Sequence, residues 1–315
     1  NMLLSRLINP KPSIQFIFII FCIIFSCLPL FYNNLEQYIS SNWIVNCLVF
    51  FAIVLLIYMH SVGINNLICK KDIIKKDNIT IAFSYILLTS PFFISLKEFV
   101  FSFILLFFLK EIFESYQKER PFKEIFNASL FVGCLGLFDS DFYFFILLII
   151  ISSVNYGNLT LRNLIIAFLG VLIPFLFFYC IKIIIDVDQL SLKKQEEVTS
   201  LSSCFKHFTK PIFLWFCIFG IINLFAFYEL FKWLYKKSIK SRKSFIILIF
   251  YAVITVLISF FYHKSLYYLL TPLAVIFGNY FTYTKRRFIA NILFLILLFS
   301  SLYVRLLFPF NNVNL

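Results

Sequence analysis

The sequence predicts an all-α polytopic membrane protein with about eleven transmembrane helices. Its 315 residues are 62% hydrophobic and only 14% charged, whereas a soluble domain is about half apolar and about a quarter charged. The mean hydropathy is +0.94. The apolar residues form long continuous runs, whereas a transmembrane barrel needs short segments of alternating polarity. Because backbone groups must be paired inside the bilayer, these runs are expected to cross it as helices.

Eleven apolar segments emerge between polar or charged breaks, and about 20 apolar residues suffice to cross the hydrocarbon core. The first segment lacks a small-residue cleavage site, so we interpret it as a retained span and not as a signal peptide. The fifth and sixth are short enough to be buried half-length helices or a re-entrant pair. The segments are approximately residues 13–31, 43–61, 79–96, 99–113, 125–138, 142–154, 162–181, 211–231, 244–262, 266–283 and 288–307.

Basic residues alternate between the connecting loops. If the N-terminus is cytoplasmic, 20 of the 28 Lys and Arg residues fall on the inner side, in agreement with the excess of positive charge in cytoplasmic loops. The same count places the C-terminus outside. We therefore expect an integral membrane protein, most simply of a bacterial inner membrane.

The chain is expected to form a single transmembrane domain over residues 1–315. Residues 1–181 would be a seven-helix module, 182–210 an outer loop and 211–315 a C-terminal four-helix part. The net charge of +13 does not indicate nucleic-acid binding, because the sequence has no folded polar domain to display a basic patch. Membrane lipids are the expected partners of the basic segment 232–243. The loop 182–210 is expected to form an amphipathic lid.

Metal-binding motifs are scarce. Six of the eight cysteines lie in or at the ends of apolar runs, no CxxC occurs, and the three histidines are far apart in sequence. A structural zinc site is therefore not expected. Asp139 and Asp141 form an Asp-Ser-Asp turn on the outer side, which is an ordinary composition for a helical hairpin. Alternatively, the two carboxylates hold a divalent cation that bridges to a phosphate.

Other polar residues on the outer side are candidates for a site. Glu36 lies in the first outer loop with no basic neighbour in sequence, and is either a solvated acid or a general base. His263 and Lys264 stand at the outer start of the tenth segment, where they could meet an anionic headgroup or a pyrophosphate. Arg305 is the only arginine inside an apolar run, and either extends to the interface or binds an anion.

This arrangement resembles the membrane part of GT-C glycosyltransferases, which take sugars from polyprenyl-phosphate carriers. Residues 128–138, 170–174 and 268–272 resemble segments of that superfamily. The resemblance implies a seven-span module, a catalytic carboxylate at Glu36 that acts as a general base, and a phosphate site at His263, Lys264 and Arg305. The chain departs from the pattern in having Glu36 alone where the family usually has Asp, and Tyr267 where it has an Arg. From its first residues to its last span the chain also resembles a family of bacterial inner-membrane proteins without an assigned function.

Three hypotheses follow. In the first, the protein transfers a sugar or glycan from a polyprenyl-phosphate carrier on the outer face, with Glu36 as base and with Lys264 and Arg305 stabilising the departing phosphate. In the second, it is a non-catalytic scaffold or assembly subunit that partners other membrane proteins. In the third, it is a transporter, although the spans lack the Gly- and Pro-interrupted pairs and buried acids expected there.

Overall fold

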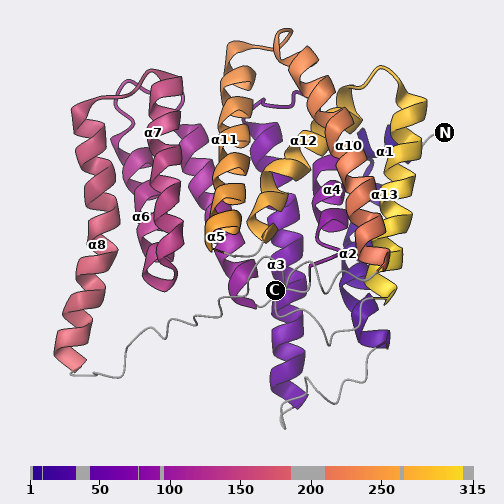
Figure 1. Ribbon diagram of the computed structural model, residues 1–315, viewed down its shortest axis with the longest axis horizontal. Coiled ribbons are helices and arrows are strands. Elements are labelled where there is room, and N and C mark those ends of the chain that lie inside the picture. Colours follow the sequence, from indigo (N-terminus) through magenta and orange to yellow (C-terminus); the bar gives the residue numbers. More distant parts are fainter. Residues whose placement is uncertain are drawn as a thin grey trace. The chain divides into compact units, whose positions relative to one another are not determined.

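A computed structural model describes residues 3–8, 10–32, 43–76, 78–92, 96–185, 210–262 and 266–307. Every regular element in these ranges is a helix (Figure 1). The elements are α1 (Leu3–Ile8), α2 (Pro12–Tyr32), α3 (Trp43–Lys70), α4 (Thr80–Leu88), α5 (Leu96–Glu114), α6 (Phe122–Phe138), η2 (Ser140–Phe144), α7 (Phe145–Tyr156), α8 (Leu161–Ile185), α10 (Lys210–Leu234), α11 (Ile239–Tyr262), η3 (Leu266–Leu269), α12 (Leu270–Tyr283) and α13 (Arg287–Leu307).

Each of the eleven apolar segments contains a helix. Within the described ranges, five helices are both long and apolar enough to cross a membrane, namely α3, α8, α10, α11 and α13. Their outward surfaces are strongly apolar, as on α8, where Phe168 and Phe177 are each 67% exposed. Such surfaces suit hydrocarbon and not water. The all-α prediction is confirmed, and the chain has the helices of an integral membrane protein.

The segment 79–96 differs from its prediction as one continuous span. Helix α4 has only nine residues, which extend about 14 Å at 1.5 Å per residue, against a hydrocarbon core about 30 Å thick. It ends shortly before Pro91, whose ring disfavours helical geometry at Ser90. The Thr89 hydroxyl donates to the carbonyl of Ile86 at 2.6 Å and satisfies one of the terminal acceptors. All nine residues of α4 are buried, so its apolar character reflects a core position.

The described chain divides into two compact units. The first contains residues 1–102, 202–241 and 267–315. Helices α4 and α12 lie side by side within it (Figure 1), and every residue of α12 except Tyr283 is buried. Close approach depends on Gly278, where an added Cβ would lie 2.4 Å from Cγ1 of Ile81. The Trp215 indole on α10 donates to Oγ of Ser301 on α13 at 3.0 Å, which binds this helix to α13.

The second unit contains residues 103–201 and 242–266, so each unit combines segments from both the 1–181 and the 211–315 regions. Its main contact joins α6 to α8 through small residues. A Cβ added to Gly133 would lie 2.9 Å from the carbonyl oxygen of Val171, and one added to Gly170 would overlap Oγ of Ser129. Ser129 and Gly133 are four residues apart, the spacing that lets membrane helices approach closely.

Candidate functional site

Arg305 is buried within the first unit, near the C-terminal end of α13. Its side chain is 7% exposed. Its Nε donates to the carbonyl of Phe25 on α2, and its Nη1 donates to the carbonyl of Phe92, both at 3.4 Å. These bonds are long for N–H donors, and a guanidinium has five N–H groups. The guanidinium is therefore enclosed by protein, and its hydrogen bonds to described residues leave N–H groups that could bind an anion.

Two tyrosines, Tyr267 and Tyr85, form a polar cluster with Arg305. Tyr267 in η3 is 1% exposed and interacts electrostatically with the Arg305 guanidinium. Its hydroxyl lies 2.6 Å from that of Tyr85 on α4. Glu98, at the start of α5, is within electrostatic range of Tyr267. The ring of Phe99 meets the Tyr267 ring edge-on, with centroids 5.3 Å apart, and fixes its orientation.

His60 on α3 forms the other end of this cluster. Its ring stacks on Tyr85 with centroids 4.5 Å apart, and its Nε2 lies 3.3 Å from Oγ1 of Thr271 on α12. A row of polar side chains thus runs from His60 through Tyr85 and Tyr267 toward Arg305, and draws on α3, α4, η3 and α13. Ionisable residues inside membrane segments are costly, so their clustering marks a functional-site candidate.

The structure places only part of the predicted site. Glu36, His263 and Lys264 lie outside the described residues. The described segments nearest to them in sequence nevertheless lead to the Arg305 cluster. Helix α2, which precedes Glu36, supplies the carbonyl of Phe25, and η3, which follows Lys264, supplies Tyr267. The meeting of Glu36 and Lys264 with Arg305 stays a prediction.

Asp139 and Asp141 belong to the second unit. Asp139 follows α6 in an extended conformation, and Asp141 is 8% exposed within η2. The Ser140 hydroxyl lies 3.4 Å from Oδ1 of Asp141. Among the described residues, no group of three or more His, Cys, Asp or Glu side chains could hold a metal ion. A cation at this turn would need most of its six to eight oxygen ligands from water or a bound phosphate.

A second polar cluster lies between α10 and α11, in the basic segment of the first unit. Nζ of Lys237 is 3.4 Å from the ring centroid of Trp233 and 3.8 Å from that of Tyr283. The main-chain N–H of Lys75 donates to the Tyr283 hydroxyl at 3.0 Å. Burial and the positive charges of Lys75 and Lys76 lower the pKa of Lys237 to about 7. This lysine is therefore held within the fold and differs from a fully solvated loop residue.

Sequence reasoning identified Arg305 but missed the residues aligned with it. Tyr85 and Tyr267 are two of 17 tyrosines and have no distinguishing motif. Their partners are also remote, since Tyr85 and Tyr267 are 182 residues apart. The available signal was His60, an ionisable residue within a predicted span, which by itself points to an interior polar contact.

Together, the apolar helices and the buried ionisable cluster define an α-helical integral membrane protein with a polar site inside one of its units. The chain matches the family described as "Family of unknown function (DUF6427)" over residues 2–312. It belongs to this family. No curated protein and no solved structure gives a significant match.

Proposed function

We propose that the protein is a GT-C-like membrane glycosyltransferase that uses a polyprenyl-phosphate-linked sugar or glycan on the outer face of the membrane, and that Arg305 binds the lipid phosphate. One observation carries the proposal. A guanidinium is buried in the helix bundle, and its hydrogen bonds to described residues are two long contacts with main-chain carbonyls. A phosphate accepts paired hydrogen bonds from this group far better than a carbonyl does.

The chemistry assigns a role to each predicted residue. The carboxylate of Glu36 accepts the proton of the acceptor hydroxyl as its oxygen bonds to the anomeric carbon. The bond from that carbon to the phosphate oxygen breaks, and its electron pair stays on the lipid phosphate. Arg305 and Lys264, with His263 beside it, stabilise the added negative charge. Tyr267 interacts electrostatically with Arg305. The binding of a divalent cation by Asp139 and Asp141, in the second unit, stays a separate prediction.

The proposed topology has eleven crossings in a bacterial inner membrane, with the N-terminus cytoplasmic and the C-terminus outside. The third crossing is the predicted segment 79–96, of which α4 is only a part and is too short to cross by itself. The division of basic residues supports this orientation. Reporter fusions test it, since an outer location of residues 232–243 or a cytoplasmic location of Leu315 contradicts it.

The transferase proposal is tested with the full chain in detergent, a labelled polyprenyl-phosphate sugar and a membrane extract as the acceptor source. Glu36→Gln should abolish transfer while expression and membrane insertion persist, because it removes the base with little change in volume. Arg305→Gln should weaken retention of the labelled lipid phosphate. Arg162→Gln, on the exposed start of α8, is the control and should match wild type. If Glu36→Gln transfers sugar like wild type, or if both site variants complement a deletion in the cell, the transferase proposal is wrong. The non-catalytic scaffold is then the preferred hypothesis, and the transporter comes after it.

A further inference from the structure

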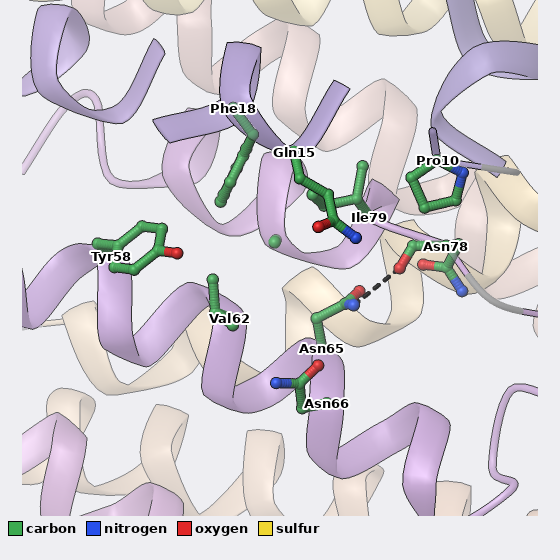
Figure 2. Close-up of a pocket in the computed structure, with 10 residues that line it drawn as sticks. Pro10, Gln15, Phe18, Tyr58, Val62, Asn65, Asn66, Asn78 and Ile79 are labelled. Atoms are coloured by element: carbon green, nitrogen blue, oxygen red, sulfur yellow. Dashed lines mark hydrogen bonds between the residues drawn. The ribbon is translucent and has the colours of Figure 1, made fainter. Parts of the chain in front are cut away.

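A cavity of about 270 Å³ opens between α2, α3 and the start of α4 in the first unit (Figure 2). Its volume is below the roughly 300–1,000 Å³ typical of sites for drug-sized ligands, so it suits one small group. Carboxamides line one part of it and apolar side chains the rest. The lining residues are Pro10, Gln15, Phe18, Tyr58, Val62, Asn65, Asn66, Asn78, Ile79 and Ala82.

Only some of the polar groups that line the cavity form hydrogen bonds within the protein. Asn78 is fully engaged, because its amide donates to the carbonyl of Lys76 at 2.8 Å and its Oδ1 accepts from Thr80 at 2.9 Å. It also anchors Asn65, whose amide donates to the Asn78 carbonyl at 2.7 Å (Figure 2). Asn78 is therefore a structural residue that holds the cavity in shape.

The other carboxamide side chains of the lining have hydrogen-bonding groups without a partner among the described residues. Oδ1 of Asn65 is buried and accepts no hydrogen bond from the described part of the chain, which is an unusual and costly state for a polar atom. Gln15 from α2 and Asn66 from α3 lie at the exposed mouth, and no hydrogen bond joins either side chain to a described residue. Figure 2 shows Gln15 and Asn65 turned toward the same space from opposite helices. A ligand with both donors and acceptors would satisfy these groups together.

The lining also defines the charge of such a ligand. None of the described lining residues is ionisable at neutral pH, so these side chains supply no charge that would neutralise a phosphate or a carboxylate, and burial of an unpaired charge is costly. Carboxamides offer both donors and acceptors, as hydroxyl groups require. The rings of Phe18 and Tyr58, with centroids 6.3 Å apart, supply an apolar wall for the C–H face of a sugar or glycerol.

Exposed apolar side chains adjoin the lining residues of both α2 and α3 in sequence. Phe16 on α2 is 64% exposed and Met59 on α3 is 48% exposed, and both are apolar. We therefore propose that the cavity binds the uncharged, hydroxyl-bearing headgroup of a membrane lipid whose tails lie along these surfaces of α2 and α3. Gln15 precedes Phe25, the Arg305 contact, by ten residues, which is about 15 Å along the helix. The lipid site is thus separate from the proposed phosphate site and does not depend on the proposed function.

The test uses the full chain reconstituted in phosphatidylcholine nanodiscs that contain either monoglucosyl-diacylglycerol or phosphatidic acid at equal mole fraction. Lipid retained on the purified protein is counted by native mass spectrometry. The wild type should retain the glucosyl lipid in preference to phosphatidic acid. The double variant Gln15→Leu, Asn66→Leu should lower retention about tenfold or more, because it removes two hydrogen-bonding groups. Both positions are exposed at the mouth, so the fold should persist.

Two further variants test whether the cavity itself is the site. Val62→Phe fills it and should abolish retention, whereas Leu169→Phe, at an exposed position of α8 in the second unit, is the control and should bind like wild type. Equal retention by Val62→Phe and wild type overturns the proposal. Retention of phosphatidic acid equal to that of the glucosyl lipid also overturns it. Displacement of the lipid by free methyl glucoside would overturn it as well, because it would indicate a water-soluble ligand.

Discussion

Replacement of Arg305 by methionine separates a functional guanidinium from a structural one. Methionine has a similar length and no charge, so Arg305→Met removes the buried cation and leaves most of the packing. If Arg305 mainly stabilises the fold, the variant should have a much lower free energy of unfolding. If Arg305 mainly binds a ligand, the free energy of unfolding should change little.

The expected change in the free energy of unfolding can be estimated from the contacts of the guanidinium. An arginine at the centre of a membrane helix costs about 2.5–3.5 kcal/mol on insertion scales, and this is the upper bound for Arg305 near the end of α13. Against this, the two carbonyl hydrogen bonds at 3.4 Å contribute about 0.5–1 kcal/mol each, the low end for such bonds because they are long. The Phe25 ring, 5.6 Å from Cζ, contributes about 0.5–1 kcal/mol. These contributions nearly cancel, so the variant should unfold within about 1 kcal/mol of wild type.

Unfolding in mixed detergent micelles measures this difference, with Leu306→Met, at the adjacent and partly exposed position, as the control. Retention of a polyprenyl phosphate is measured in parallel. Arg305→Met should lower it at least tenfold, since a charge-assisted hydrogen bond is typically worth more than the 1.4 kcal/mol that corresponds to tenfold. A destabilisation of 3 kcal/mol or more, the size expected when a buried ion pair is broken, would refute the reasoning and make Arg305 a structural residue.

Other perturbations test the packing and the polar surface. Gly170→Ile should separate α6 from α8 and destabilise the second unit by about 1–3 kcal/mol through overpacking, which proteolysis of the detergent-solubilised chain would reveal as faster cleavage; unchanged cleavage would contradict the close packing. Burial raises the pKa of Glu124, but the hydrogen bond and charge of Lys118 outweigh it and hold the pKa below its usual value. Stability should therefore fall as pH drops through the acidic range, and Glu124→Gln should remove that part of the pH dependence in equilibrium unfolding. Lys237, with its pKa lowered to about 7, binds fewer protons in the folded than in the unfolded chain, so stability should rise between about pH 7 and the ordinary lysine range. Lys75→Gln should raise the pKa of Lys237 by removal of a like charge, measured as an upward shift in the pH profile of its reductive methylation; a downward shift would exclude the repulsion.

Much of the fold could be predicted because membrane helices are encoded locally. A run of about 20 apolar residues is itself the condition for a span, so the eleven segments and the helices within them follow from hydropathy. Arg305 could be recognised for the same reason, since a charge inside an apolar run conflicts with its surroundings. The small residues of α6 and α8 were visible in sequence, but their partners were not.

Tertiary structure decided what hydropathy leaves open. An apolar segment has the same hydropathy whether it faces lipid or protein. Only the packing of the helices shows that α4 is a nine-residue core helix and that α8 is largely exposed. The polar row joins His60, Tyr85, Tyr267 and Arg305 across as many as 245 positions of the chain, and the cavity needs Asn78 to orient Asn65 from another segment. Hydrophobic burial is non-directional and selects which segments enter the bilayer, whereas hydrogen bonds are short and directional and exist only once the helices have packed. The sequence by itself therefore determined the class of protein, and the packing of the helices determined where its polar groups meet.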